Sequence, residues 1–305
     1  MQNTNNLLMI KPVNFGFNDE TALNNAFQIK DTNINYNVQE KALNEFNNYV
    51  KKLEENGINV TVIDDTPVPH TPDSIFPNNW ISFHSDNRIC LYPMFALNRR
   101  LERKNTVIEI IKNKFIVKDI VDLTYYENKD LFLEGTGSMV LDRVFKVAYA
   151  CLSARTNIVV LKDFAEKFGY KIVTFNATDK NNLPIYHTNV VMSVTEQIVI
   201  ICLEAVNDKL ERETLKETIS NTKKELLEIS FEQMNSFAGN ILQVKNNVGI
   251  QFMIMSQSAY NSLTTSQISK IEKYNKIIAV NLDTIEKNGG GSARCMLAEI
   301  FLENK

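Results

Sequence analysis

Residues near the end of the sequence combine the types needed for nucleophilic chemistry. Three consecutive glycines, residues 289–291, precede Cys295. Glycine is costly to order, so such a run predicts backbone that passes close to another group. Arg294 comes directly before the cysteine, and a nearby guanidinium favours the thiolate, which is the nucleophilic form. The stretch therefore predicts a reactive cysteine, with a flexible loop before a buried cysteine as the plain alternative.

A reactive cysteine needs a proton carrier and an electrostatic partner, and the sequence offers few. His187 is one of only three histidines, and it is the one whose position suits acid–base chemistry. Glu134 lies between Leu133 and Gly135, where a carboxylate would be costly to bury without a cationic or donor partner. The plain alternative for His187 is a hydrogen-bonded core histidine. His70 and His84 are expected to be surface or packing residues.

A repeat in the sequence predicts how these residues are brought together. Short apolar segments open at Asn79, Gly137, Asn189 and Asn240, in steps of 58, 52 and 51 residues. One further step reaches the stretch that contains Cys295. After a polar turn, each segment is followed by a second apolar segment, as in a β-hairpin; these are residues 88–92, 144–149, 198–203 and 248–253. Cys90, Cys151 and Cys202 fall within these second strands and are expected to be small buried hydrophobic residues.

Helical spacing and short strands complete each repeat unit. Helices are predicted over residues 99–114, 156–168, 208–222 and 262–274, and strands over 116–119, 171–175, 226–229 and 276–280. Before the repeat, we expect a strand at 7–12, a helix at 37–56 and a strand at 59–63. The sequence thus predicts an α/β fold of five hairpin–helix–strand modules in one domain over residues 1–305. Such modules can close in a ring, as propeller blades do, which places the loops before the first strands around one axis.

Composition excludes several classes of partner. The 305 residues are 44% hydrophobic and 23% charged, with a formal net charge of −3, so we expect a soluble globular protein that does not bind nucleic acid. No apolar run approaches the roughly 20 residues of a membrane span, and residues 1–6 lack the features of a signal peptide. The four cysteines are far apart, which predicts no metal site and a cytoplasmic location. The sequence leaves open whether the chain forms a homo-oligomer.

Five motifs together carry a family resemblance. The chain resembles the guanidine-modifying (pentein, or amidinotransferase) superfamily of five-bladed α/β propellers over nearly its whole length. That group includes arginine deiminases, dimethylarginine dimethylaminohydrolases, amidinotransferases and arginine dihydrolases. Within it, the chain is most similar to arginine-deiminase-related proteins of the citrulline-utilization hydrolase type. The motifs are Pro-Asp-Ser-Ile-Phe-Pro-Asn-Asn-Trp (72–80), Leu-Glu-Gly-Thr-Gly (133–137), Ser-Ala-Arg-Thr (153–156), His-Thr-Asn (187–189) and Gly-Gly-Gly-Ser-Ala-Arg-Cys-Met (289–296).

The resemblance implies a role for each site residue. Cys295 would attack the central carbon of a guanidinium, His187 would carry protons, and Glu134 would anchor a substrate nitrogen. Arg155 and Arg294 resemble the arginines that hold the α-carboxylate of the substrate. The remaining matches, which would shape the pocket around the reacting group, are Asp73, Asn78, Asn79 and Asn189. The implied chemistry forms a covalent S-amidino or S-carbamoyl intermediate and needs no cofactor or metal.

Two departures from the deiminase pattern bear on the substrate. Deiminases carry carboxylates where this chain has Asn79 and Asn189. A carboxylate only accepts hydrogen bonds and suits a guanidinium, whereas asparagine also donates and suits the carbonyl of a ureido group. We therefore expect a small guanidino or ureido amino acid, citrulline or arginine-like. The plain alternative is that Asn189 caps its strand and that Asn79 affects only the rate.

Two other functions fit the same residues less specifically. An amidinotransferase would pass the covalent group to an amine instead of water, and a non-catalytic protein of the same fold would only bind. Residues 14–37 and the proline-rich residues 64–73 form loops that could act as a lid over the site.

Overall fold

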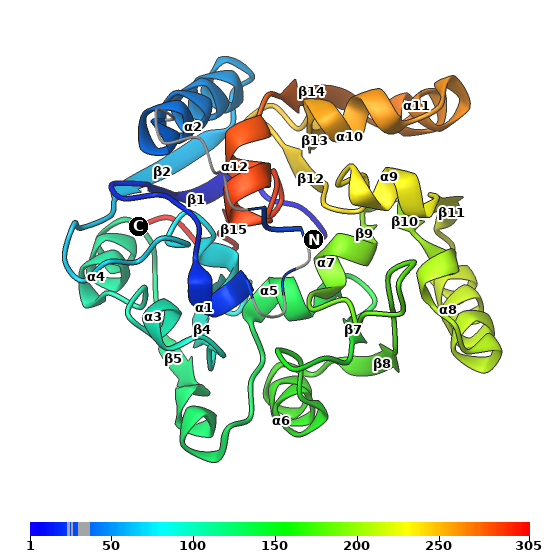
Figure 1. The fold of residues 1–305 in the computed structure, drawn as a ribbon, viewed down its shortest axis with the longest axis horizontal. Helices are drawn as coiled ribbons and strands as arrows, with labels where there is room; N and C mark the ends of the chain where they lie inside the picture. The colour runs from blue at the N-terminus through cyan, green and yellow to red at the C-terminus, as the bar shows by residue number, and fades with distance from the viewer. Residues whose placement is uncertain (23–24, 26, 30–36) are drawn as a thin grey trace.

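The strands of the computed structural model pair in five sheets of three strands each. The model describes residues 1–22, 25, 27–29 and 37–305. Four sheets follow one another along the chain (Figure 1). They are β3 (Ile81–Phe83), β4 (Arg88–Leu91) and β5 (Asp119–Asp122); β6 (Val140–Asp142), β7 (Val147–Cys151) and β8 (Lys171–Phe175); β9 (Met192–Val194), β10 (Ile198–Ile201) and β11 (Glu225–Glu228); and β12 (Leu242–Lys245), β13 (Gln251–Ser256) and β14 (Lys276–Val280).

Each of these four sheets has the same pairing. The first two strands form an antiparallel hairpin, and the third runs parallel to the second. A parallel pair needs a crossover connection, and a helix provides it in every case: α4 (Asn105–Lys114), α6 (Ile158–Phe168), α8 (Lys209–Asn221) and α11 (Thr265–Glu272). In Figure 1 these helices lie at the periphery and the first strands lie toward the centre. The predicted α/β repeat is confirmed.

The fifth sheet joins the two ends of the chain. Its strands are β15 (Ala298–Glu299), β1 (Asn6–Lys11) and β2 (Asn59–Asp64), with α2 (Val38–Glu55) as the crossover. Leu7 pairs antiparallel with Glu299, and β1 runs parallel to β2 from end to end. This sheet therefore has the same pairing as the others, although its first strand comes last in the sequence.

Local sequence signals explain where the crossover helices begin and end. The Asn157 side chain accepts a hydrogen bond from the Val159 N–H at the start of α6, and Gly169 ends the helix with a φ of +69°. Helix α2 buries Ala42, Phe46, Tyr49 and Leu53, whose spacing of three or four residues puts them on one face. The remaining helical segments are short: α1 (Asp19–Ala22), η1 (Pro77–Asn79), α3 (Leu97–Arg100), η2 (Thr124–Lys129), α5 (Gly135–Ser138), α7 (Thr188–Val191), η3 (Leu203–Ala205), α9 (Phe231–Asn235), α10 (Gln257–Ser262) and α12 (Asp283–Gly289).

Several predicted bounds are wrong. Asn79, Gly137 and Asn189 were expected to open strands, but they lie in the helical turns η1, α5 and α7, and each strand begins two or three residues later. The helix predicted over 99–114 is two helices, α3 and α4, and the strand predicted at 116–119 is β5, three residues further along. An apolar stretch of five residues does not distinguish a helical turn followed by three strand residues from one continuous strand.

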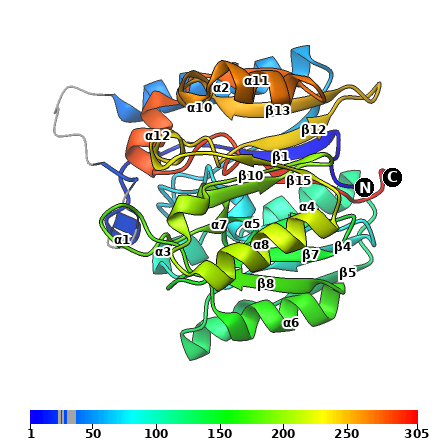
Figure 2. The ribbon, with the colours of Figure 1, turned by 90° about the vertical axis from the view of Figure 1, so that its right-hand side faces the viewer.

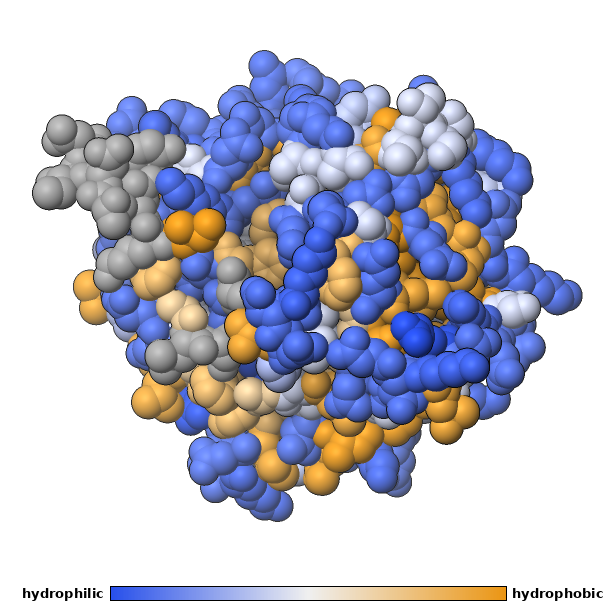
Figure 3. All heavy atoms as spheres, turned by 45° about the vertical axis from the view of Figure 1, so that its right-hand side comes forward, coloured by the Kyte–Doolittle hydropathy of each residue, from blue (hydrophilic) through white to orange (hydrophobic). Residues whose placement is uncertain are grey.

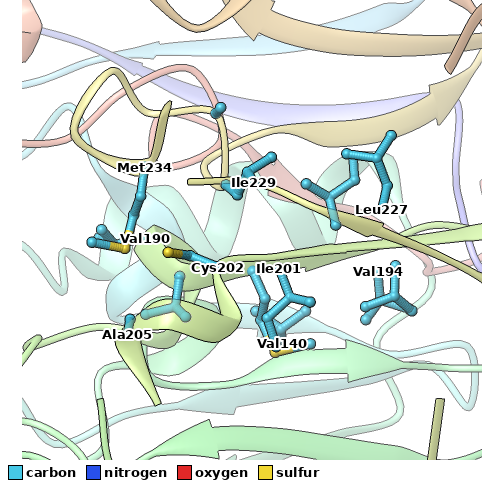
Figure 4. Close-up of a cluster of buried hydrophobic side chains, with 14 of the residues drawn as sticks. Val140, Val190, Val194, Ile201, Cys202, Ala205, Leu227, Ile229 and Met234 are labelled. Atoms are coloured by element: carbon cyan, nitrogen blue, oxygen red, sulfur yellow. The ribbon is translucent and has the colours of Figure 1, made fainter. Parts of the chain in front are cut away.

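The core between neighbouring sheets is apolar and closely packed. Figure 4 shows one such cluster, in which side chains from the sheets of β6 and of β10 meet those from α7 and α9. Cys151 and Cys202 belong to this cluster and Cys90 to another, and all three are fully buried, which confirms the prediction that these cysteines are packing residues. The labelled members are Val140, Val190, Val194, Ile201, Cys202, Ala205, Leu227, Ile229 and Met234.

Several short helices and the two chain termini lie on opposite sides of the molecule (Figure 2). In Figure 2, α1, α3, α7 and α12 lie toward one side, and both chain termini lie on the other. The face in Figure 3 is largely hydrophilic, with hydrophobic residues in separate patches. Among the described residues, no helix is long and apolar enough to span a membrane.

Two glycines allow neighbouring modules to approach closely near the centre. A Cβ on Gly135 would lie 2.3 Å from the Asn78 carbonyl oxygen, and a Cβ on Gly239 would lie 2.2 Å from the Val190 carbonyl oxygen. Both obstacles are backbone atoms, which cannot turn aside as a side-chain end can. Because these two residues have no side chain, the segments before β6 and β12 can contact the backbone of the preceding module directly.

Replacing Gly239 by alanine should test this constraint. We expect Gly239→Ala to lower the free energy of unfolding by about 1–3 kcal/mol, the usual cost of overpacking. Gly16→Ala is the matched control, because nothing lies within 4 Å of a Cβ at Gly16, and its effect should stay within about 0.5 kcal/mol. Urea unfolding of the two variants beside the wild type measures both values, and equal stabilities would contradict the packing argument.

Candidate active site

Cys295 is positioned by the glycine run that follows α12. Gly290 ends this helix in the left-handed conformation, with a φ of +65°. A Cβ on Gly289 or Gly291 would lie 2.8 or 2.9 Å from the ring of Phe76. The prediction that the glycine run passes close to another group is confirmed, and that group is an aromatic ring from the first module.

Cys295 lies at the wall of a small cavity of about 20 Å³. That volume is close to the space of one water molecule. Five of the predicted site residues line it: Cys295, His187, Asn79, Arg155 and Asp73. The other lining residues are Asn25, Phe76, Arg99, Tyr186 and Gly289, Gly290 and Gly291.

His187 and Glu134 form a buried pair beside the cavity. His187 precedes helix α7, and its Nε2 lies 2.8 Å from Glu134 Oε2. Burial lowers the pKa of His187 to about 4, although Glu134 opposes this shift. The imidazole is therefore neutral at pH 7. Because an ionised carboxylate only accepts hydrogen bonds, Nε2 carries the proton and Nδ1 keeps a lone pair.

Glu134 itself is fully buried and surrounded by donors. Its Oε1 accepts a hydrogen bond of 3.0 Å from the Phe95 N–H, and its Oε2 lies 3.6 Å from Arg155 Nη1 and 3.9 Å from Arg99 Nη1. Burial opposes ionisation, but Arg155, His187 and Arg99 outweigh it and hold the pKa of Glu134 well below its usual range. Glu134 is not among the residues that line the cavity. The expectation that it grips a substrate nitrogen gains no support from this placement, which suits orientation of His187 instead.

Asn79 is held in one orientation by Arg99, a residue that sequence reasoning missed. Arg99 Nη1 donates to Asn79 Oδ1 at 2.8 Å, while Nε and Nη2 bind the two oxygens of Glu102 at 2.9 and 3.0 Å. A guanidinium has no acceptor, so the oxygen of Asn79 must face it and Nδ2 points elsewhere. Asn79 Nδ2 is buried and has no hydrogen-bond partner among the described residues. Nothing in the run Asn98-Arg99-Arg100 signals this role, because no motif surrounds it.

Arg155 and Asp73 form the wall nearest to the N-terminal segment. Arg155 Nη2 donates to the Thr21 carbonyl at 3.0 Å, and its guanidinium lies 4.8 Å from the centre of the Tyr186 ring. Asp73 Oδ2 accepts hydrogen bonds from Asn18 and Thr21, at 2.8 and 3.1 Å. Asp73 Oδ1 is buried without a partner among the described residues, and burial raises the pKa of this carboxyl group.

Two asparagines hold the sulfur of Cys295. Asn189 Nδ2 lies 3.4 Å from Sγ, and Asn240 Nδ2 lies 3.1 Å from it. Asn189 was predicted to contact the substrate, but its side-chain nitrogen contacts the nucleophile. Asn240 was recognised only as the start of the fourth repeated segment, and its contact with the sulfur could not be read from the sequence.

Arg294 and Asn78 are not at the cavity. Arg294 donates to the Leu297 carbonyl at 3.0 Å and to Glu299 Oε2 at 3.3 Å, so its guanidinium pairs with β15. Asn78 is fully buried and donates to Thr136 Oγ1 at 3.4 Å. The placement of Arg294 does not support its predicted contact with a substrate carboxylate, because its donors are directed to Leu297 and Glu299.

Each of the two predicted lid loops contributes a residue to the lining of the cavity. Much of the loop at residues 14–37 lies outside the described residues, namely 23, 24, 26 and 30–36. Of its described part, Asn25 lines the cavity and Gln28 Nε2 donates to the Asn288 carbonyl at 2.8 Å. Asp73, at the end of the other loop, also lines the cavity. A lid function for either loop stays a prediction.

Histidines, cysteines and carboxylates elsewhere do not form a competing site. Within the part of the chain that the structure describes, no group of three such residues is placed to hold a metal ion. His70 is exposed, and His84 is buried with its ring stacked on Phe168 at 4.0 Å, so both are surface or packing residues as predicted.

Comparisons with known proteins show which family the sequence matches. A family model for eukaryotic N,N dimethylarginine dimethylhydrolase matches residues 11–302. A comparison with curated proteins finds no match.

The fold is shared with several solved enzymes. The N-terminal domain of ArgZ, an arginine dihydrolase from the ornithine–ammonia cycle in cyanobacteria, superposes in a substrate-bound mutant with a TM-score of 0.76 at 18% identity, over 98% of both chains. The chain spans 40% of the length of ArgZ itself. DDAH from Pseudomonas aeruginosa, in a mutant complexed with citrulline, gives a TM-score of 0.64 at 16% identity over 98% of this chain and 100% of that one.

These findings confirm the resemblance that the five motifs indicated. The family model covers nearly all of the sequence, including every residue that lines the cavity. The chain therefore belongs to the family of eukaryotic N,N dimethylarginine dimethylhydrolases, within the superfamily of guanidine-modifying enzymes.

Proposed function

We propose that this protein is a cysteine-dependent hydrolase of guanidino and ureido amino acids, with arginine and citrulline as its substrates. The observation that carries the proposal is the meeting of Cys295 and a neutral His187 at one small cavity. A nucleophile with a base oriented by a third group is the arrangement required for covalent catalysis. Here Glu134 is that third group, at 2.8 Å from His187.

The reaction proceeds in two stages for each carbon–nitrogen bond. Neutral His187 takes the proton of the Cys295 thiol, the resulting thiolate adds to the central carbon, and His187 delivers that same proton to the departing nitrogen. His187 then removes a proton from water, which attacks the S-linked carbon and releases the thiolate. One cycle converts arginine and water into citrulline and ammonia. In a second cycle citrulline loses ammonia, and water releases the carbon from the sulfur as a carbamic acid on the ornithine nitrogen, which decomposes to ornithine and carbon dioxide.

Unpartnered polar atoms at the cavity support a ureido ligand. Asn79 offers only a donor, because Arg99 occupies its oxygen, and Asp73 Oδ1 offers only an acceptor while ionised. Buried polar groups without partners are costly, so a bound ligand should satisfy them. The carbonyl oxygen of a ureido group can accept from Asn79, which a guanidinium cannot. We assign Arg155 to the substrate carboxylate, as the family resemblance implies.

The neighbours and the fold are consistent with this assignment. ArgZ is described as an arginine dihydrolase, and the DDAH structure contains citrulline. We further infer that the five sheets close into a five-bladed propeller in one domain over residues 1–305, located in the cytoplasm. The pairing of β15 with β1 supports this closure, because it joins the two ends of the chain in one sheet.

Product analysis with three substrates tests the proposal. Wild type and Cys295→Ala would each be incubated with arginine, citrulline and Nω,Nω-dimethylarginine, with ammonia, dimethylamine, citrulline and ornithine measured. We expect ornithine from both arginine and citrulline, and a loss of at least about 10⁴-fold in the alanine variant because no nucleophile remains.

Other products would revise the proposal in defined ways. Citrulline that accumulates from arginine without ornithine contradicts the reading of Asn79. Release of dimethylamine only from dimethylarginine would make the chain a dimethylarginine hydrolase, as its family is described. Turnover that requires an added amine acceptor would indicate an amidinotransferase.

The protonation state of His187 can be tested without substrate. A folded pKa of about 4, below the ordinary 6.5, means that the unfolded chain binds more protons between these values. His187 therefore contributes stability that is fully present above pH 6.5 and is lost as the pH falls toward 4. Between pH 7 and pH 5 we expect wild type to lose roughly 2 kcal/mol more than His187→Gln.

Urea unfolding at the two pH values gives this difference directly. Glu134 contributes little above pH 5, because its pKa lies below its usual range in the folded state and near 4.5 otherwise. Equal losses in wild type and variant would show that the pKa of His187 is not lowered in the folded protein, which would contradict the effect of burial described above.

A further inference from the structure

Asn240 lies against the sulfur of Cys295 and has no role in the mechanism described so far. It comes at the end of the loop between α9 and β12, and its side chain is buried. Its Nδ2 lies 3.1 Å from Cys295 Sγ and 2.9 Å from the Asn189 carbonyl oxygen. Three modules meet at this point, because Asn189 belongs to the third, Asn240 to the fourth and Cys295 to the fifth.

The orientation of the Asn240 carboxamide follows from its partners. A backbone carbonyl oxygen can only accept a hydrogen bond, so the atom that faces Asn189 O must be the nitrogen. That nitrogen carries two hydrogens, one for the carbonyl and one for the sulfur. Asn189 supplies a second carboxamide nitrogen at 3.4 Å from the same sulfur. Cys295 Sγ therefore has two neutral donors beside it.

Donation to the sulfur has a chemical consequence. A thiol is a weak acceptor and a thiolate a strong one, so two N–H donors stabilise the thiolate more than the thiol. The guanidinium of Arg294, which the sequence suggested for this purpose, is bound to Leu297 and Glu299. The carboxamides are thus the groups in hydrogen-bonding contact with the nucleophile.

The loop that presents Asn240 is held in a strained and precise conformation. Phe237 has a φ of +62°, which is rare for a bulky residue, and Asn240 N–H donates to its carbonyl at 2.8 Å. A Cβ on Gly239 would lie 2.2 Å from the Val190 carbonyl, so this loop sits directly on α7. Backbone strain of this kind persists where surrounding contacts over-determine a functional geometry.

We propose that Asn240 is a catalytic residue that, together with Asn189, stabilises the thiolate of Cys295 as its proton passes to His187, and fixes the direction of its attack. The inference rests on the proposed function, in which Cys295 is the nucleophile. It assigns the donor pair to the resting enzyme, before substrate binds. It also gives Asn189 a task that differs from the substrate contact expected from the sequence.

Alkylation of Cys295 by iodoacetamide at pH 7 measures the thiolate without any substrate. The other cysteines should not interfere, because none of them lines this cavity and burial raises the pKa of Cys202 to about 11 and that of Cys151 to about 12, with Cys90 higher still. Mass spectrometry of the labelled peptide identifies the residue. The same preparations would be assayed for kcat and KM with arginine.

Asn240→Asp is the decisive variant, because it keeps the shape of the side chain and replaces its donor by an anion. We expect the alkylation rate of Cys295 to fall about tenfold or more, the size expected for loss of a hydrogen bond to a charged group. The kcat should fall by a similar factor, with KM within about threefold. Asn275→Asp is the matched control. Asn275 is a buried asparagine whose Nδ2 donates to the Ile271 carbonyl at 3.1 Å, and its substitution should leave the rate within about twofold.

A second variant keeps the inference testable if Asn240→Asp does not fold. Asn189→Ala removes the other donor and leaves the carbonyl to which Asn240 is bound, so it should also slow alkylation. An unchanged rate in a folded Asn240→Asp or Asn189→Ala protein would overturn the inference.

Alkylation and turnover also separate this inference from the proposed function. Fast, Asn240-dependent alkylation without turnover would contradict the hydrolase and support the donor pair. Turnover combined with an alkylation rate that does not depend on Asn240 would support the hydrolase and contradict the donor pair.

Discussion

The carboxylate of Glu134 is the interaction on which the site depends. It is withdrawn completely from water, and a buried anion is stable only when donors and positive charges replace its hydration. The replacements come from different parts of the chain: the Phe95 N–H, the guanidinium groups of Arg155 and Arg99, and the ring of His187. Removing any one of these groups would leave the buried carboxylate less well compensated. The requirement to compensate one charge thus ties three modules together around the cavity.

Close backbone approach is the second constraint. The turns η1, α5 and α7 lie side by side because Gly135 has no side chain to separate them from Asn78. Gly137 has the same role toward the side chains of Asn79 and His187, since its Cβ would lie 2.3 Å from Asn79 Nδ2 and 2.9 Å from the His187 ring. Polar side chains of several modules can therefore meet in a space that holds about one water molecule.

The sequence was sufficient for the repeat and for three residues of the site, but not for their contacts. Period and hairpin turns predicted five α/β modules, and the bounds of β8 and β14 were predicted correctly. Motifs predicted Cys295, His187 and Glu134, which the fold brings together. Arg99 and Asn240 were not assigned, because an arginine in a helical segment or an asparagine before a strand is common. Arg294 was misjudged for a related reason: adjacency in sequence does not say where a long side chain points, and β15 provides a carboxylate at Glu299 that attracts it.

The fifth sheet sets the order in which the protein can be assembled. Leu7 pairs with Glu299, so β1 waits for its partner until almost three hundred residues have been synthesised. Contacts of such long sequence separation form late, since the entropy of closing the chain must be overcome first. Cys295 precedes β15 by two residues and therefore gains its surroundings only at that step. The surroundings of Cys295 are therefore expected to form together with this sheet and not before it.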